Sequence, residues 1–443
     1  MINEMRYSIH TSFARRGVLL LASVFVLTIV GRLVTITNAA LFCPGWPVCI
    51  PTDRIGYIKL FHLILVGMAS LVMIEVWRKA WREQRHHPSI LPLTTVTGVL
   101  FFGQAFVGAI EVTSHYPTHL VVLHGLTAVA LWVSLAMLVF VSGTLKEDGV
   151  ADYQFGWRQR VKDFVILSKP VIVLLLLVTT YGGLVAGGKA FPSASLTLWT
   201  LLGGALAAGG SSALNQYIDR ELDKNMQRTS KRPLADGRLT PAEGLSYGLA
   251  LCLLSYYLMA GYVNLLAALL SLAGIFYYVF FYSVWLKKAT VQNIVIGGGA
   301  GAIPPMVGWA AATGNLSLGA WILFAIIFMW TPPHFWALAI VRLKDYERAG
   351  VPMLPVVEGE EKTRKQILIY TVELIAVTLL LPIFNLAGTI YLVSALVLGA
   401  FLLYAAWNVW RVGGNKTAWI MYRWSSMYLA FIFLALMVDA VVY

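Results

Sequence analysis

Long apolar runs constrain this chain more than any other feature. Stretches of about 20 apolar residues, enough for a helix to cross a hydrocarbon core of about 30 Å, begin near residues 17, 57, 91, 119, 169, 196, 241, 264, 291, 317, 366, 387 and 417. Hydrophobic residues make up 59% of the 443 residues and charged residues only 12%, which leaves too little polar surface for a soluble domain. The sequence therefore predicts an all-α polytopic membrane protein with about 13 transmembrane helices.

The basic residues indicate a membrane topology. A net charge of +12 suits nucleic acid only with a basic face or groove, and here Lys and Arg instead form short clusters between the apolar runs. With Arg6, Arg15 and Arg16 in the cytoplasm, only Arg54 and Lys189 fall in outside loops. The positive-inside rule therefore predicts a cytoplasmic N-terminus and a C-terminus outside, with a lipid bilayer as partner and no nucleic acid.

The first apolar run bears on localisation. It follows Arg15-Arg16 but is too long for a signal-peptide core and lacks a small-residue cleavage site, so we interpret it as an uncleaved anchor. No Arg- and Ser-rich transit segment precedes it, which favours the plasma membrane of a prokaryotic cell. Cys43 and Cys49 lie in the first outside loop, where oxidising conditions permit a disulfide, whereas Cys252 is expected to pack inside a span.

A polar stretch divides the chain into two modules. Residues 143–168 form the longest polar stretch of the first half, with four expected spans before it and nine after it. We therefore expect a four-helix membrane domain at residues 1–145, a cytoplasmic linker at 146–168 and a nine-helix domain at 169–443.

The sixth expected span ends in an acidic face at the cytoplasmic surface. Asn215, Asp219 and Asp223 are spaced by four residues, so their side chains follow one another along one face of a helix. Mg²⁺ takes a few such oxygen ligands and completes its shell with water and substrate phosphates, so this face is a candidate metal site that would hold a diphosphate. The alternative is a helix end whose charges are simply solvated at the interface.

A second acidic position and a set of basic residues extend the candidate site. The tenth span returns to the cytoplasm just before Asp345 and Tyr346, and Asp345 is a further candidate metal ligand. Basic side chains near both acidic positions can donate to phosphate oxygens, and the candidates are Arg228, Lys231, Arg232, Lys287, Lys288, Arg342 and Lys344. Positive-inside anchoring alone is the alternative for any one of them.

These motifs resemble those of a known family. Asn215-x-x-x-Asp219-x-x-x-Asp223 is similar to the first aspartate motif of the UbiA-type intramembrane prenyltransferases, which also have nine spans with both motifs inside. The runs 226–238, 287–309 and 345–355 look like those of the heme O synthases, the protoheme IX farnesyltransferases, and the match spans roughly residues 165–443. A generic second motif has two aspartates four apart, but the flanking places here are Val341 and Ala349, which favours the heme-modifying branch.

The resemblance implies a UbiA-type helical bundle, an enzymatic activity and roles for particular residues. Asn215, Asp219, Asp223, Asp345 and Tyr346 would form the catalytic site, with Mg²⁺ as cofactor. Farnesyl diphosphate would ionise, the vinyl group of protoheme IX (heme B) would attack, and water would complete heme O. Prenylation of a quinone precursor or chlorophyllide is an alternative that the Asp345-Tyr346 pattern fits less well.

Three features of this module have competing interpretations. His334 follows Pro332 and Pro333 and is either a cap for the helix break that the prolines impose or a heme contact. Tyr346 also suits an interface anchor. The glycine-rich run at 297–301 lies inside an apolar span, which indicates close helix packing rather than a nucleotide loop.

Two histidines characterise the N-terminal module. His62 and His124 each lie five residues into a span, about 8 Å below the outer surface at 1.5 Å per residue. At one depth on two helices they can supply opposed axial nitrogens to one heme iron. Ordinary hydrogen bonding between helices is the alternative.

The N-terminal module resembles one half of a heme A synthase, by these histidines, the sequence Gly31-Arg-Leu-Val-Thr35 and the loop between Cys43 and Cys49. In that family a glutamate stands three residues before the first histidine, whereas this chain has Lys59, and Leu63 replaces a common arginine. The resemblance therefore implies heme binding or delivery rather than oxidation of heme. A separate heme A synthase or a second copy of this chain would be the partner.

A function of a different class also remains open. A heme transporter or membrane cytochrome would bind heme but release no diphosphate, even with Asp219 and Asp223 intact.

Overall fold

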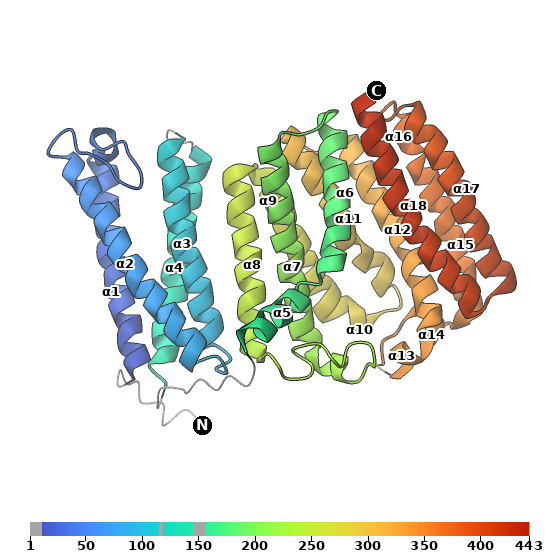
Figure 1. Cartoon of the computed structure of the whole chain (residues 1–443), viewed down its shortest axis with the longest axis horizontal. Coiled ribbons are helices and arrows are strands. Elements are labelled where there is room, and N and C mark those ends of the chain that lie inside the picture. The colour runs from blue at the N-terminus through green and yellow to red at the C-terminus, as the bar shows by residue number, and fades with distance from the viewer. Residues whose placement is uncertain (1–10, 115–117, 146–155, 349, 443) are drawn as a thin grey trace. The chain divides into compact units, whose positions relative to one another are not determined.

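The computed structural model describes residues 11–114, 118–145, 156–348 and 350–442, and every element in these ranges is helical (Figure 1). Twelve of the described helices are long and apolar enough to cross a membrane. The prediction of an all-α polytopic membrane protein is therefore confirmed. The segment expected near residue 196 forms helix α7 (Ala194–Lys224), which is not among the twelve because its many Gly, Ser and Thr residues make it less apolar.

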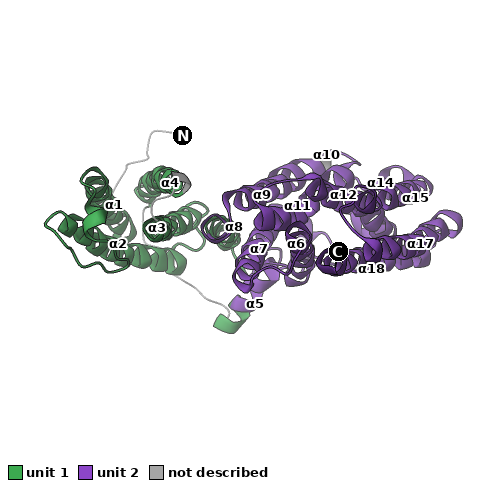
Figure 2. Cartoon of the chain, turned by 90° about the horizontal axis from the view of Figure 1, so that it is seen from above, with its two compact units in different colours: residues 1–160, 239–257 green, residues 161–238, 258–443 purple. Residues whose placement is uncertain are grey.

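The chain forms two compact units (Figure 2). Unit 1 contains the described parts of residues 1–160 and 239–257, and unit 2 contains residues 161–238 and the described parts of 258–443.

Unit 1 is built on four long helices. They are α1 (Ser12–Ile36), α2 (Gly56–Glu83), α3 (Ile90–Thr113) and α4 (Thr118–Ser142), with a short 3₁₀ helix η1 (Ala39–Phe42) after α1. Each packs on two others in a closed order, α1 on α2, α2 on α3, α3 on α4 and α4 on α1. Polar side chains join two of these pairs, since Thr97 donates to Ser134 at 3.2 Å and Trp132 donates to Thr28 at 3.2 Å.

Helix α8 (Pro241–Tyr262) contributes residues 241–257 to unit 1, although the sequence boundary assigns it to the second module. Two hydrogen bonds join this segment to the rest of unit 1: Thr240 donates to the carbonyl oxygen of Arg85 at 2.7 Å, and the Tyr257 hydroxyl donates to Thr127 at 3.3 Å. Within the expected linker, residues 157–167 form helix α5 (Trp157–Leu167), and 146–155 lie outside the described residues.

Unit 2 holds the remaining helices. The long ones are α6 (Pro170–Gly188), α7, α9 (Leu265–Phe276), α11 (Asn293–Thr313), α12 (Leu318–Val341), α15 (Gly359–Thr378), α17 (Thr389–Val412) and α18 (Gly414–Val442). The short ones are the π-helix η2 (Tyr277–Leu286), α10 (Lys287–Ala289), α13 (Leu343–Arg348), α14 (Leu354–Val357) and α16 (Leu380–Ile383). Buried Trp336, Tyr391 and Phe433 are among the large side chains of its core.

Helices α6 and α11 meet at glycines. A Cβ on Gly308 would lie 1.9 Å from the Thr180 carbonyl oxygen, and one on Gly183 would lie 2.1 Å from the Pro305 carbonyl oxygen. The two backbones are therefore in direct contact, as small residues allow in membrane helix pairs. The glycine-rich run at 297–301 lies within α11 and packs in part on aromatic side chains, since a Cβ on Gly297 would meet Tyr282 at 2.4 Å.

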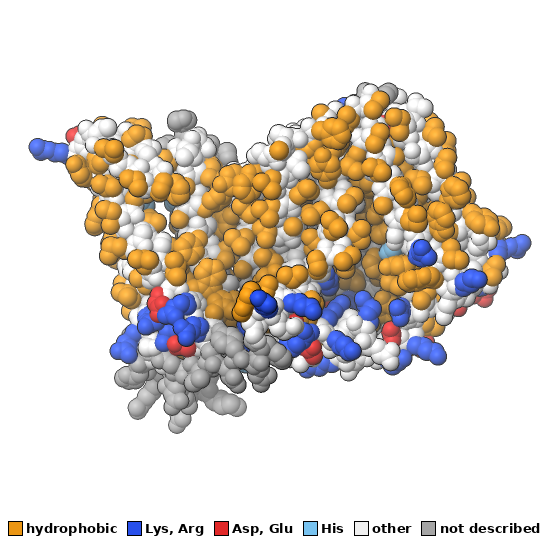
Figure 3. Space-filling view, in the orientation of Figure 1, with side chains coloured by type: hydrophobic (Ala, Val, Ile, Leu, Met, Phe, Trp, Pro, Cys, Tyr) orange, Lys and Arg blue, Asp and Glu red, His pale blue; other side chains and the backbone are white. Residues whose placement is uncertain are grey.

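Charged side chains are concentrated at one end of the helices. In unit 2 this is the end that carries α5 and α13, where Figure 3 shows Lys and Arg gathered below an orange apolar surface. An exception inside the bundle is Asp439 of α18, whose carboxylate accepts from the backbone N–H groups of Gly388 and Tyr391 and so caps the start of α17.

Substitution at the α6–α11 contact should destabilise the fold. We expect Gly308→Ala to lower the free energy of unfolding by about 1–3 kcal/mol, because the added methyl group overpacks a backbone contact. Gly301→Ala is the matched control on α11, since a Cβ there meets nothing within 4 Å. Unfolding in an SDS titration followed by circular dichroism measures both. Equal stability of the two variants would contradict the close contact.

Candidate functional site

The candidate site is centred on one face of the second half of α7. Asn215, Asp219 and Asp223 lie four residues apart on this face, and each is only 3–4% exposed. The Asn215 amide donates to Asp219 Oδ2 at 2.8 Å and to Ser283 Oγ of η2 at 3.0 Å. A π-helix is a rare element that often marks a functional site, and here it brings Ser283 to the acidic face.

Cations neutralise the two buried carboxylates. Lys287 Nζ lies 2.6 Å from Asp219 Oδ2, and Arg232 NH1 lies 2.7 Å from Asp223 Oδ2. Arg232 reaches back because the chain turns after α7, where Thr229 Oγ1 also donates to the Asp223 carbonyl oxygen at 3.2 Å. Removing a carboxylate from water is costly without such a partner, so these ion pairs offset the burial of the acidic face.

Lys169 belongs to the same cluster and was missed in the sequence. Its Nζ donates to Asn215 Oδ1 at 3.0 Å. Burial and the neighbouring Arg232 guanidinium lower the pKa of Lys169 to about 7, so it titrates near neutral pH. Its backbone is left-handed, with φ +48°, a conformation that costs a residue with a side chain of order 1–3 kcal/mol and that often marks functional sites. The sequence signal was a lysine directly before Pro170, at the start of a span.

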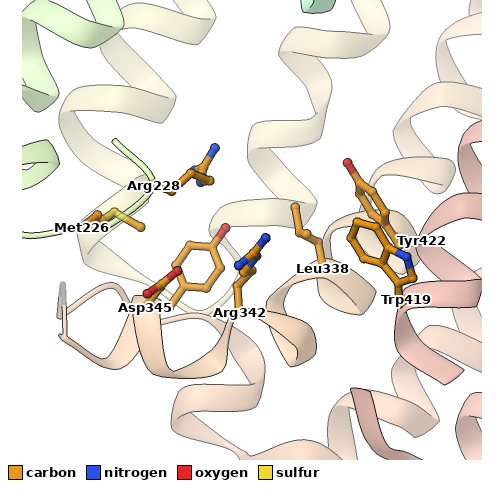
Figure 4. A pocket seen from close by; sticks show the side chains of 8 residues that line it. Met226, Arg228, Leu338, Arg342, Asp345, Trp419 and Tyr422 are labelled. Atoms are coloured by element: carbon orange, nitrogen blue, oxygen red, sulfur yellow. The ribbon is translucent and has the colours of Figure 1, made fainter. Parts of the chain in front are cut away.

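The second acidic position lines a pocket of about 190 Å³ in unit 2 (Figure 4). It is walled by charged and aromatic side chains, namely Met226, Arg228, Leu338, Arg342, Asp345, Tyr346, Trp419 and Tyr422. Burial raises the pKa of Tyr346, so its phenol stays neutral and can donate a hydrogen bond. Asp345 has only Arg348 as an ion-pair partner in the described part of the chain, at 4.0 Å.

The two acidic positions border the same region of unit 2. Tyr282 of η2 is within electrostatic range of Asp219, Tyr346 and Arg228. The structure therefore brings the acidic face of α7 and the pocket around Asp345 together. Among the described residues no group of three or more His, Cys, Asp or Glu lies close enough together to hold a metal ion.

The other basic candidates differ in their surroundings. Lys231 and Lys344 are exposed, and the side chain of Lys288 lies outside the described residues. Arg342 and Arg228 are also exposed and line the pocket.

His334 lies in a continuous helix. Helix α12 runs through Pro332 and Pro333 to Val341, so the expected helix break is wrong. The Pro-induced loss of a backbone donor is tolerated there inside a packed bundle, where neighbouring groups satisfy the backbone. His334 is buried, its Nδ1 lies 2.7 Å from Ser425 Oγ, and its ring stacks between Trp330 and Tyr422 at 4.2 and 4.5 Å.

In unit 1, His62 of α2 and His124 of α4 lie within electrostatic range of each other. The Nδ1 atoms of both are buried and make no hydrogen bond in the described part of the chain. Glu111 Oε2 lies 3.4 Å from His124 Nδ1. Glycines give both rings room, because a Cβ on Gly31 would lie 3.0 Å from His62 and one on Gly108 would lie 2.9 Å from His124.

A disulfide and a buried lysine hold the loop between α1 and α2 in place. Cys43 and Cys49 form a disulfide with a Cα–Cα distance of 5.3 Å. Lys59, which is 3% exposed, donates to the Cys43 carbonyl oxygen at 2.5 Å. Lys59 thus has a structural partner in this loop.

Comparison with known proteins defines the class. The profile of the UbiA prenyltransferase family matches residues 176–432. A solved structure from a study of digeranylgeranylglyceryl phosphate synthase shares the fold with a TM-score of 0.56 at 16% identity, covering 64% of this chain and all of that one. The chain belongs to the UbiA prenyltransferase family, and it is therefore a membrane-embedded prenyltransferase.

Its curated relatives narrow the group. A protoheme IX farnesyltransferase of Roseiflexus sp. (strain RS-1) is 40% identical over 98% of this chain and 84% of its own length. A protoheme IX farnesyltransferase of Gloeobacter violaceus is 48% identical over 63% of this chain and 92% of its own length. The resemblance to the heme O synthases is thereby confirmed.

The ion pair at Asp223 should carry part of the stability of unit 2. We expect Arg232→Met to lower the free energy of unfolding by on the order of 3 kcal/mol, because it leaves a buried carboxylate unpaired. Lys231→Met removes an exposed neighbouring cation and should change stability by about 0.5 kcal/mol or less. Thermal unfolding of both detergent-purified variants makes the comparison, and equal losses would argue against the pair.

Proposed function

We propose that this chain is a heme O synthase, which joins farnesyl diphosphate, water and protoheme IX to give heme O and diphosphate. The observation that carries the proposal is the buried face of Asn215, Asp219 and Asp223, bordered by cations and by the Asp345 pocket. A relative named protoheme IX farnesyltransferase that aligns with nearly the whole chain supplies the substrate class.

The donor set of the acidic face fits Mg²⁺. Two carboxylates and one amide oxygen are hard ligands, and Mg²⁺ in phosphate-handling sites takes one or two carboxylates plus water and substrate phosphates. Asn215, Asp219, Asp223 and Asp345 are the residues that would hold the ion. When bound, Mg²⁺ neutralises part of the negative charge that grows on the departing diphosphate.

The cations of the site would bind the diphosphate itself. Lys287 and Arg232 now pair with the carboxylates, and both can turn to phosphate oxygens when a metal ion occupies the acidic face. Arg228, Lys231, Lys288 and Lys344 remain diphosphate candidates of the second rank, and the neutral Tyr346 phenol can donate to the same anion.

The bond changes follow from this placement. The allylic C–O bond of farnesyl diphosphate breaks and its electron pair leaves with diphosphate, which the cations stabilise. The vinyl carbon of protoheme forms the new C–C bond, and water adds to the neighbouring cationic carbon with loss of one proton. Apolar surroundings for the prenyl chain would keep water from quenching the farnesyl cation first.

Conservative removal of one charge should abolish turnover. We expect Asp219→Asn and Asp223→Asn each to lower the rate of heme O formation by about 100-fold or more, since each removes stabilisation of the leaving group. EDTA should stop the wild-type reaction. Glu221→Gln is the matched control, because Glu221 lies between the two on α7 but is exposed. Mass spectrometry of extracted heme reads out farnesyl-plus-water gain, and an active Asp219→Asn variant would overturn the proposed role.

We also propose that the N-terminal module binds heme through His62 and His124. The buried Nδ1 atoms, neither of which makes a hydrogen bond in the described part of the chain, and the glycines that face both rings support this role better than an interhelical hydrogen bond. Relatives of two lengths support a separable module, since one group aligns with nearly all of the chain and another with only 63% of it. Lys59, bound to the loop, offers no acid for oxidative chemistry, so binding or delivery is the proposed role.

Heme bound by this pair should be visible in the purified protein. We expect a low-spin bis-histidine absorption spectrum that is lost in His62→Ala and in His124→Ala. His86→Ala, which changes an exposed histidine, should leave the spectrum intact. A spectrum that persists in both core variants would reject the assignment.

A further inference from the structure

The pocket around Asp345 carries positive charge that no protein group uses. In the described part of the chain neither Arg228 nor Arg342 makes an ion pair or a hydrogen bond through its guanidinium, whereas Lys287 and Arg232 at the acidic face are both paired. Two free guanidinium groups at one pocket make a receptor for an anion with planar, two-oxygen geometry.

The opposite side of the pocket is aromatic. Figure 4 shows Asp345 and Arg228 toward one side and Trp419 and Tyr422 toward the other, with Arg342 between them. Trp419 and Tyr422 lie three residues apart on α18 and stack at 5.3 Å, with an angle of 23° between their rings.

This pair is the end of a longer ladder of stacked rings. Tyr422 stacks on His334 at 4.5 Å, and His334 stacks on Trp330 at 4.2 Å, both with interplanar angles below 30°. Ser425 holds His334 and Trp330 in place, because its hydroxyl bonds to His334 Nδ1 and its carbonyl oxygen accepts from Trp330 Nε1, at 2.7 Å each. The ladder is therefore rigid, and its last ring, Trp419, is 42% exposed.

Four near-parallel rings fastened in this way suit a flat aromatic ligand better than a prenyl chain. A flat ligand can extend the stack at Trp419, which is partly exposed and lines the pocket, as nucleobases do on aromatic side chains. The pocket of about 190 Å³ is smaller than pockets that enclose a whole drug-sized ligand, so it would receive only one edge of such a molecule. An edge that carries carboxylates would meet the free arginines.

We propose that this pocket is the acceptor subsite of the prenyl transfer reaction, where Trp419 stacks on the tetrapyrrole ring and Arg342 binds a propionate carboxylate. The proposal rests on the proposed function, and it names the side of the site that the acceptor occupies. It also assigns Arg342 to the acceptor and leaves the diphosphate to the other cations of the site.

The ester of the acceptor gives a direct test. Protoheme and its dimethyl ester share the ring but differ in the charge of the propionates. We expect the wild type to show a KM for the ester about tenfold or more above that for protoheme, as loss of a charge-assisted hydrogen bond predicts. Arg342→Gln should raise the KM for protoheme by a similar factor and should leave the KM for the ester nearly unchanged.

Controls separate the two substrates. The KM for farnesyl diphosphate should be unchanged in Arg342→Gln, and Trp419→Ala should raise the KM for protoheme and for its ester together. Arg411→Gln and Trp407→Ala, both exposed on α17, are matched controls that should change neither value. A raised KM for farnesyl diphosphate in Arg342→Gln, or equal KM values for protoheme and ester in the wild type, would overturn the proposal.

A binding measurement distinguishes failure of this inference from failure of the proposed function. Heme titration followed by absorbance, in protein with His62→Ala, His124→Ala and Asp219→Asn, reports the pocket without turnover. Weaker binding of the ester than of protoheme supports the subsite even if no heme O forms. Equal binding of the ester and of protoheme rejects the subsite even if heme O forms. This comparison uses protein in which Arg342 is unchanged.

Discussion

The burial of two carboxylates at the end of a membrane helix is the constraint on which unit 2 depends. Asp219 and Asp223 are almost inaccessible, and an unpaired charge in that position would cost several kcal/mol. Arg232 comes from the turn after α7 and Lys287 from α10, and each forms an ion pair with one of these carboxylates. The turn after α7 and the π-helix η2 therefore position the cations that neutralise the two buried carboxylates.

The same constraint explains the composition of α7. A helix that must bring polar side chains into a bundle and pack closely there needs small residues, and its Gly, Ser and Thr content keeps it out of the set of most apolar helices. Mean hydropathy, which identifies the other spans, is thus lower for the helix that carries the proposed metal-binding face.

The sequence was sufficient for the helical class, the number of spans to within one and the spacing of the acidic face, because each depends on local periodicity. It could not reveal Lys169, whose partner Asn215 is 46 residues away and whose left-handed backbone precedes a proline. Nor could it distinguish Arg232, which pairs with Asp223, from Arg228, which lines the pocket. The two lie four residues apart, and the course of the turn after α7 determines which one reaches the carboxylate. The continuity of α12 through Pro332 and Pro333 likewise depends on tertiary packing.

The glycine contact between α6 and α11 has a consequence for movement. Helices that touch through side chains can slide past one another by exchanging rotamers, but backbones in van der Waals contact have no such layer to rearrange. Helices α6 and α11 therefore move as one rigid body. The short segments α13 and α14 are joined to the bundle by far less packing, so displacements within unit 2 are expected there before they occur at the α6–α11 pair.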